Sequence, residues 1–310
     1  MDSIVSLLRL VLISMVPFAL SSQGTMFAGR TGIFIVAQEG IMLTGASVGF
    51  IVSYLTNGNN WLGALAALIV GGIFGAITAY FSVKLKMNQF VIGLSLLFIG
   101  IGLSTLIPKI VIGITLTQPL IPTLKNIPIP ILSQIPLIGP VLFNHNVLVY
   151  LSILLSIGFW YFMFRTQKGL ELRSVGENPM AADSLGINTV SKRYWAAIIG
   201  GALIALAGAY LPMVYTGTFT ELMTRGRGWL SIALTFFGGW SPMPILWGSL
   251  FFSAIDVASI SLQTAGFPIP YQYLLMVPYL ATILVMVFTF GKARVPGFLG
   301  MNYDRENRNL

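Results

Sequence analysis

Residue types that carry most enzyme and metal chemistry are scarce in this chain of 310 residues. It has no cysteine, which excludes disulfide bonds, zinc–thiolate sites and thiol nucleophiles. It has one histidine, His145, which excludes a cluster of histidines around a metal, and we expect this residue to lie in a loop. A Gly-x-x-x-x-Gly-Lys-Ser/Thr phosphate-binding loop is also absent, so the chain does not hydrolyse ATP by the route that this motif serves.

Charged side chains are equally scarce. They make up only 8% of the residues, against 56% hydrophobic residues, and the mean hydropathy is +0.86. This composition excludes an ordinary soluble globular protein and indicates an integral membrane protein. The net charge of +8 does not indicate nucleic acid binding, because the basic residues lie in the connections between apolar runs.

Eight apolar runs are long enough to cross a bilayer core of ~30 Å. They cover residues 4–21, 32–55, 61–83, 90–107, 147–164, 194–214, 245–262 and 273–290, and a ninth, shorter run covers residues 229–239. We interpret the first run as a span and not as a signal peptide, because no convincing cleavage site follows it. The sequence therefore predicts an all-α, polytopic bundle of about eight or nine spans, forming one domain over residues 1–310.

The basic residues predict which connections face the cytoplasm. Such residues lie at Lys84 and Lys86, in the connection 165–194, and in the tail 291–310, which carries Lys292, Arg294, Arg305 and Arg308. An even number of crossings must separate these segments, so the run 229–239 has to cross on its own, as a short or broken helix. The same parity places the N-terminus outside, provided that the run 32–55 crosses once.

The connection 108–146 contains seven prolines, which prevent a continuous helix. Parity places it on the external side. It either lies on the membrane surface, where it could meet an external protein, or packs as an apolar loop over the bundle.

Gly32, Gly40, Gly45 and Gly49 lie along one apolar run, where they indicate either close packing or a helix break. Two glycine-containing segments are also similar to each other. GRTGIFIVA from Gly29 and GRGWLSIA from Gly226 resemble each other weakly, and parity places them on opposite faces. Inverted-topology repeats, with a pathway at their interface, would produce this relation. Chance similarity between glycine-rich apolar segments is the alternative.

Three charged residues, Arg9, Glu39 and Asp256, fall within apolar runs, where each costs ~2.5–3.5 kcal/mol at a helix centre. Glu39 either contacts the substrate or hydrogen-bonds backbone groups or Arg30 and holds a helix break in shape. We expect Asp256 to have a structural partner, and Arg9 to be either an anchor or part of a polar path. No nucleophile or metal cluster accompanies these charges, so the sequence does not indicate an enzyme.

A polar island, GENPMAADSLGI, interrupts the apolar sequence between residues 176 and 187. Asn178 is a suitable N-cap, Pro179 suits the first helical position, and Gly186 can end the helix. The sequence therefore predicts a short helix over residues 178–185, on the cytoplasmic side.

This island resembles the coupling segment of the permease subunits of bacterial ABC importers of the branched-chain amino acid, simple sugar and nucleoside type. In that family the segment docks into a groove on the ATPase subunit. The resemblance implies that the coupling residues are Gly176, Glu177, Asn178, Ala181, Ala182 and Gly186.

Three other stretches resemble the nucleoside branch of that family, and within it the second of two permeases. They are GIFIVAQEGIMLTGA from Gly32, GRGWLSIALTFFGGWSPM from Gly226, and VPYLATILVMVF with the tail RVPGFLGMNYDRENR. Sugar permeases usually lack the acidic-Gly-x-Met-Leu pattern that this chain has at Glu39 to Leu43.

The resemblance implies a multi-pass permease of the bacterial inner membrane that imports a small molecule, most simply a nucleoside. Its expected partners are a second permease, an ABC ATPase subunit that carries ATP and magnesium, and an external substrate-binding protein or lipoprotein. The chain itself is expected to bind no cofactor.

A nucleoside has hydroxyl groups and a flat base, so polar and aromatic residues near the helix breaks are candidate contacts along the substrate path: Gln38, Glu39, Phe34 and Trp229. The alternatives are a sugar or branched-chain amino acid importer of the same family, and an ATP-independent secondary transporter.

Overall fold

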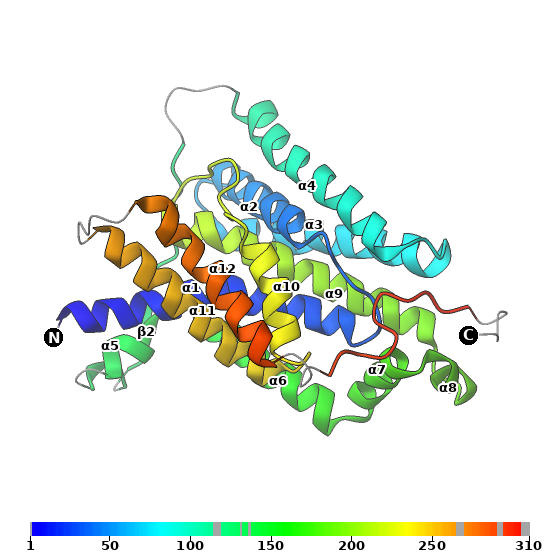
Figure 1. The fold of residues 1–310 in the computed structure, drawn as a ribbon. Coiled ribbons are helices and arrows are strands. Elements are labelled where there is room, and N and C mark those ends of the chain that lie inside the picture. Colours follow the sequence, from blue (N-terminus) through cyan, green and yellow to red (C-terminus); the bar gives the residue numbers. More distant parts are fainter. Residues whose placement is uncertain are drawn as a thin grey trace.

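Helices form nearly all of the regular structure in the computed structural model, which describes residues 2–113, 119–130, 132–135, 138–264, 270–289 and 294–304 (Figure 1). The α-helices are α1 (Asp2–Gly29), α2 (Gln38–Leu55), α3 (Asn60–Ala79), α4 (Gln89–Val111), α5 (Ile138–Leu142), α6 (Val147–Arg165), α7 (Gln167–Glu177), α8 (Pro179–Ser184), α9 (Thr189–Tyr210), α10 (Arg227–Phe237), α11 (Pro242–Thr264) and α12 (Tyr271–Thr289). Short π-helical turns follow α3 (η1, Tyr80–Lys84) and α9 (η3, Leu211–Thr216), and η2 (Leu132–Gln134) is a 3₁₀ turn. Two short strands, β1 (Ile127–Pro128) and β2 (Asn144–His145), pair antiparallel, with Ile127 opposite His145.

The helices confirm the all-α class of membrane protein. Among the described residues, six helical segments are long and apolar enough to cross a membrane: Ile4–Gly29, Asn60–Lys84, Gln89–Val111, Val147–Arg165, Thr189–Thr216 and Pro242–Gln263. The count of eight or nine crossings, and the inverted repeats, stay predictions.

Helix α9 lies at the centre of the bundle, where it packs against α1, α2 and α3. Small residues allow this packing, because a Cβ atom added to Gly208 would lie 1.8 Å from the carbonyl oxygen of Met42, and one added to Gly71 would lie 2.2 Å from that of Gly201. Close approach of backbones through small residues is typical of helices packed in a bilayer.

Several predicted boundaries were wrong. The run 32–55 becomes helical only at Gln38, because residues 30–37 are held in a turn and an extended segment. Helix α4 includes Pro108 and ends at Val111, since a proline in the last turn removes only one helical hydrogen bond. The predicted connection 165–194 contains an additional helix, α7, and α9 begins at Thr189.

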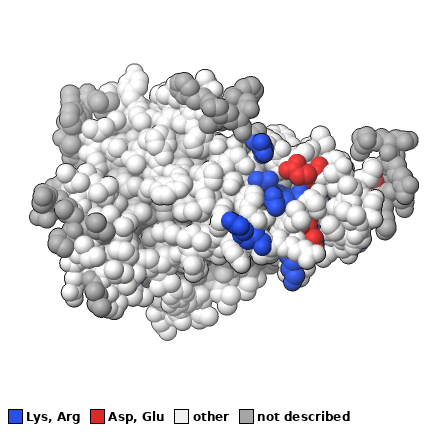
Figure 2. Space-filling view, turned by 90° about the horizontal axis from the view of Figure 1, so that it is seen from below, with Lys and Arg blue, Asp and Glu red and all other residues white. Residues whose placement is uncertain are grey.

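The two ends of the bundle differ in charge. The N-terminus lies at the end opposite α7, α8 and the C-terminal segment (Figure 1). In the view from below, the charged side chains that are visible gather near the end that carries α7 and α8, and the white part of this face is formed by other residues (Figure 2). This arrangement matches the one that the positive-inside argument predicts, although Lys292, Arg305 and Arg308 lie outside the described residues.

The described part of the connection 108–146 packs over the opposite end of the bundle. The backbone N–H of Ile121 donates to the carbonyl of Gly217 (2.8 Å), and that of Leu124 to the carbonyl of Met213 (2.9 Å). The side chain of Asn60 donates to the carbonyl of Pro122 (2.7 Å). The structure therefore favours the packed-loop interpretation of this segment.

Candidate substrate path and coupling surface

Two non-helical segments enter the bundle from opposite ends. The first break, residues 30–37, connects α1 to α2, and the second break, residues 217–226, connects η3 to α10. The first comes from the end that carries α7, and the second from the end covered by the connection 108–146. Non-helical backbone at membrane depth requires hydrogen-bond partners within the protein, and it is typical of segments that line a path.

Glu39 joins the two breaks. It lies in the first turn of α2 and is 8% exposed. Its Oε1 accepts hydrogen bonds from the hydroxyl of Thr224 (2.5 Å) and the backbone N–H of Gly226 (2.8 Å), and its Oε2 accepts one from the N–H of Gly228 (2.7 Å). We call this arrangement of Glu39 with residues 224–228 the Glu39 junction. The carboxylate satisfies free N–H groups at the start of α10, where the helix dipole also favours a negative charge.

The sequence left two interpretations of Glu39, contact with the substrate or support of a helix break. These hydrogen bonds fit the second, in which the carboxylate bonds backbone groups and holds the break in shape. Gly228 shows how close the two helices come, because a Cβ atom there would lie 2.6 Å from the backbone nitrogen of Glu39. The two helix N-termini therefore meet at one buried negative charge.

Of the other predicted path residues, Gln38 and Trp229 adjoin the junction in sequence, whereas Phe34 contacts the far end of α10. Gln38 is fully buried and hydrogen-bonds to Ser21 (3.3 Å) and Thr25 on α1. Phe34 makes edge-on ring contacts with Phe236 and Trp240, at centroid distances of 5.9 and 6.3 Å. Trp229 follows the junction on α10 and is 42% exposed.

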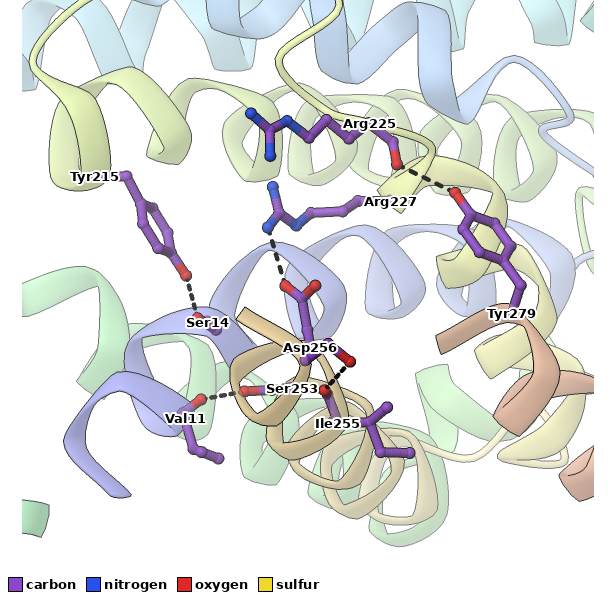
Figure 3. A network of polar contacts seen from close by, with 10 residues as sticks. Val11, Ser14, Tyr215, Arg225, Arg227, Ser253, Ile255, Asp256 and Tyr279 are labelled. Atoms are coloured by element: carbon purple, nitrogen blue, oxygen red, sulfur yellow. Dashed lines mark hydrogen bonds and ion pairs between the residues drawn. The ribbon is translucent and has the colours of Figure 1, made fainter. Parts of the chain in front are cut away.

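A second polar network lies beside the start of α10 (Figure 3). Arg227 pairs with Asp256 of α11 at 3.0 Å, so Asp256 has the structural partner that we expected. The hydroxyl of Tyr279, on α12, donates to the carbonyl of Arg225 (3.2 Å). The guanidinium of Arg225 points toward that of Arg227 (Figure 3), and among the described residues it makes no hydrogen bond or ion pair.

These residues line a pocket between α1, α10, α11 and α12. Apolar walls come from residues such as Phe18, Leu230 and Leu274, and the polar members are Arg225, Arg227, Asp256, Ser259, Gln263 and Tyr279. An apolar cleft with a few converging polar groups is the usual form of a small-molecule site. Sequence reasoning singled out Asp256 but missed Arg225, Arg227 and Tyr279. The two arginines had one signal, charge next to a predicted short or broken helix, and Tyr279 had none.

The polar island forms the predicted capped helix. The side chain of Asn178 accepts a hydrogen bond from the N–H of Ala181 (3.0 Å), Pro179 occupies the first helical position, and Gly186 has φ +81°. Local capping alone specifies this helix, which explains why the sequence predicted it closely.

The six residues predicted to couple divide by exposure. Glu177, Asn178, Ala181 and Gly186 are exposed, whereas Gly176 and Ala182 are buried. Leu185, which the sequence analysis missed, is 81% exposed at the end of α8. Helices α7 and α8 therefore present a small protruding surface with an apolar tip.

Arg30 connects this surface to the first break. Its guanidinium lies 3.8 Å from the carboxylate of Glu177, and its Nε donates to the carbonyl of Trp240 (2.7 Å). Burial lowers the pKa of Arg30, while the negative charge of Glu177 raises it. Because the ordinary pKa of arginine is so high, the group stays charged.

The described residues include no group of three or more His, Asp or Glu side chains that could hold a metal ion. Their chemistry is that of hydrogen bonding and packing around two helix breaks.

Comparison with known proteins identifies the chain. The family described as "Branched-chain amino acid transport system / permease component" matches residues 7–287. The chain belongs to this family. It is thus the permease component of an ABC transporter, a multi-pass membrane protein whose relatives are transporter subunits.

Several relatives extend over nearly the whole permease. The guanosine ABC transporter permease protein NupQ of Bacillus subtilis is 32% identical, with 94% of each chain covered. The nucleoside ABC transporter permease protein NupC of Lactococcus lactis is 33% identical over 97% of this chain and 98% of its own. A putative glucose ABC transporter permease protein, TsgC13 of Haloferax volcanii, is 32% identical over 93% of this chain and 94% of its own.

Proposed function

We propose that this permease belongs to an ATP-driven importer of nucleosides in the bacterial inner membrane. The observation that carries the proposal is the capped α8 surface, which stands on the charged end of the bundle and connects through Glu177 and Arg30 to a helix break. A partner ATPase, carrying ATP and magnesium, would dock on this surface through Glu177, Asn178, Ala181 and Leu185. Gly176, Ala182 and Gly186 would give the surface its shape.

Nucleosides are favoured over other substrates by the relatives and by the path. Two of the relatives at 32–33% identity are named for guanosine or nucleosides, and both match over at least 94% of their length. The candidate path offers both polar and aromatic groups, which suit the hydroxyls and flat base of a nucleoside. In this path Glu39 fixes the junction and Gln38 bonds to α1 beside it, while Phe34 packs at the far end of α10. Trp229 and Tyr279 are the aromatic groups that a base could contact.

The proposed partners are a second, nonidentical permease, the ATPase and an external substrate-binding protein or lipoprotein. A pair of permeases is supported by the relatives, because both NupQ and NupP of Bacillus subtilis resemble this chain, at 32% and 23% identity. The bundle would alternate access around the two breaks as the ATPase closes, by a rigid-body movement of packed helices.

A glucose importer is the second candidate, since TsgC13 is 32% identical to this chain. An ion-driven secondary transporter is a third, which the exposed coupling surface disfavours.

Uptake measurements distinguish these candidates. Cells with and without this chain are given labelled nucleosides, glucose or branched-chain amino acids, and the measurement is repeated with the partner ATPase inactivated. We expect the chain to be required for nucleoside uptake alone, and only with an active ATPase. Glucose uptake would support the second candidate, and uptake that follows an ion gradient without the ATPase would contradict the proposal.

The coupling role has its own test. Substitution Ala181→Asp should place a charge on the docking surface and uncouple ATP hydrolysis from uptake, while the permease partner still co-purifies. Ser191→Asp, at the start of α9, is the matched control for added charge at this end. If both variants transport normally, α8 does not couple the ATPase to the path.

A further inference from the structure

The C-terminal segment crosses the charged end of the molecule instead of leaving it. We define residues 296–304 as the C-terminal strap, which runs beside α7 in Figure 1. The N–H of Phe298 donates to the carbonyl of Gly176 (2.8 Å), and that of Gly297 donates to the carboxylate of Glu177 (3.2 Å). Farther along, the hydroxyl of Tyr303 donates to Asp183 of α8 (3.0 Å). The strap is therefore fixed to both helices of the coupling surface.

The same strap is fixed to the first break. The N–H of Gly300 donates to the carbonyl of Gly32 (3.0 Å). The side-chain Nε2 of Gln89 donates to the carbonyls of Gly32 and Met301 (both 3.4 Å). Its Oε1 accepts a hydrogen bond from the N–H of Phe34 (2.7 Å). Strap, α4 and first break thus share one hydrogen-bonded cluster.

The strap also holds the loop between α3 and α4. The side chain of Asn302 donates to the carbonyls of Lys86 (2.6 Å) and Met87 (3.0 Å), and Asp304 pairs with Lys86 at 2.5 Å. A segment only nine residues long therefore connects three separate parts of the charged end.

The contacts leave little free space between these parts. A Cβ atom added to Gly176 would lie 2.2 Å from the carbonyl oxygen of Arg30, so α7 rests directly on the backbone of the first break. A Cβ atom added to Gly32 would lie 2.8 Å from the carbonyl oxygen of Phe298 and 3.0 Å from the guanidinium of Arg193. Close-packed protein transmits displacement, because it compresses little.

The first break continues directly to the Glu39 junction. Arg193 of α9 donates to the carbonyl of Thr31 (3.0 Å), and α2 begins at Gln38, beside the glutamate. A short, largely buried segment therefore joins residues 30–32 to the carboxylate that holds the start of α10.

We propose that the C-terminal strap and Arg30 form a transmission element, which ties the coupling surface to the first break so that displacement of α7 and α8 moves the Glu39 junction. Arg30, Asn302 and Tyr303 are then positioning residues for coupling. The proposal rests on the proposed function only in that an ATPase docks on α8, and it does not depend on which substrate is transported. A physical link of this kind is demonstrated by showing that it biases the movement of the distant element.

The natural absence of cysteine makes this movement measurable. Leu222, which is 56% exposed in the second break, is replaced by cysteine as a reporter. The full importer in lipid nanodiscs is treated with a maleimide, with and without ATP and vanadate, and the ratio of the two labelling rates is measured. We expect this ratio to differ from one by about 5-fold or more, the usual size of coupling between sites.

The strap variant Asn302→Ala/Tyr303→Phe should bring the ratio close to one, while the ATPase still co-purifies and hydrolyses ATP. Tyr161→Phe, which removes an exposed hydroxyl on α6, is the matched control and should keep the original ratio. A strap variant that keeps the original ratio would overturn the proposal.

A disulfide tests the link in the opposite direction. Glu177→Cys and Gly297→Cys are added to the strap variant, since a Cβ atom added to Gly297 would lie 3.0 Å from the carbonyl oxygen of Glu177. Labelling is then measured only on the peptide that carries the reporter, because the two new thiols also react when reduced. Oxidation should restore the labelling ratio of the reporter, and reduction of the same sample should abolish it again. The proposal is wrong if the bridge does not form, or if it forms without restoring the ratio. Nucleoside uptake is measured in parallel and tests the substrate separately. If the importer takes up no nucleoside, the proposed substrate is wrong, but the labelling ratio still tests the strap.

Discussion

The two helix breaks differ in how they are held. Residues 31–33 and 35–37 of the first break are buried, and side chains from α4 and α9 hydrogen-bond to its backbone. The second break exposes Leu222 and Arg225, which both have left-handed backbone conformations, with φ +54° and +48°. Non-glycine residues in this conformation typically cost about 1–3 kcal/mol each. The comparison indicates a firmly held first break and a strained second break, which is the difference that the proposed transmission element requires.

The Glu39 junction, which joins the breaks, should give the largest effect when altered. Glu39→Gln removes the charge that three donors share and turns an amide donor toward them, so we expect a loss of about 3 kcal/mol in the free energy of unfolding. Denaturant unfolding in detergent measures this loss, and uptake should fall with it. Glu221→Gln, in an exposed ion pair with Lys109, should change stability by less than about 1 kcal/mol. Equal losses in the two variants would contradict the role of the junction.

Each break contains a glycine with a similar backbone angle, so the same substitution at the two glycines compares the breaks directly. Gly32 (φ +88°) and Gly226 (φ +78°) both become strained as alanine, but only at Gly32 does the added Cβ meet a backbone atom, the carbonyl oxygen of Phe298. At Gly226 it meets the hydroxyl of Tyr279, a side-chain end that can rotate away. Gly32→Ala should therefore be less stable than Gly226→Ala by about 1–3 kcal/mol.

Gly113→Ala supplies the baseline for that comparison, because its φ is +83° and no described residue lies within 4 Å of the added Cβ. Thermal unfolding of the three purified variants gives the order. If Gly226→Ala loses the most stability, the second break is the more rigid of the two.

The ion pair beside the second break should contribute less to the free energy of unfolding than the Glu39 junction does. Arg227 and Asp256 are 16% and 21% exposed, so solvent screens the pair only in part. A double-mutant cycle with Arg227→Gln and Asp256→Asn should give an interaction energy of about 1 kcal/mol. An interaction energy as large as the loss in Glu39→Gln would mean that the second break is fixed as firmly as the first.

We expect the smallest effect on stability from His145, which lies outside both breaks and serves as a reference. Burial lowers the pKa of His145 below its ordinary value of 6.5; the hydrogen bond with the Val141 carbonyl raises it, and Arg9 lowers it further. The unfolded chain therefore takes up a proton at a higher pH than the folded chain. Stability should be full above about pH 6.5 and should fall as the pH drops toward the folded pKa.

His145→Gln should remove this component of the pH dependence, which thermal unfolding between pH 5 and 8, a range of roughly one unit or more on each side of the ordinary pKa, would detect. A variant with the same pH profile as the original chain would assign the dependence to other groups.

Local sequence signals predicted the features that depend on neighbouring residues. Asn178, Pro179 and Gly186 specified α8, because capping groups act within one helical turn. Asp256 was expected to have a partner because an isolated charge in a membrane is costly. That the partner is Arg227 could not be predicted, since 29 residues and a helix end separate the two.

Features that depend on distant contacts were missed. The glycines from Gly32 onward indicated close packing or a break, but not what would hold the break: Arg193 and Gln89, far along the chain, bond to its backbone. The tail was interpreted only as a basic cytoplasmic segment, and nothing in its composition indicated that it would bind Gly176 and Gly32.

The sequence by itself determined that this protein is an all-α membrane permease with a short capped helix, α8, because hydrophobicity, charge and capping act over short stretches of chain. Only the tertiary structure decided that Glu39 joins two breaks and that the strap connects the coupling surface to one of them. These contacts join residues about 120–190 positions apart, and their energy arises only when the packed bundle removes the competing water.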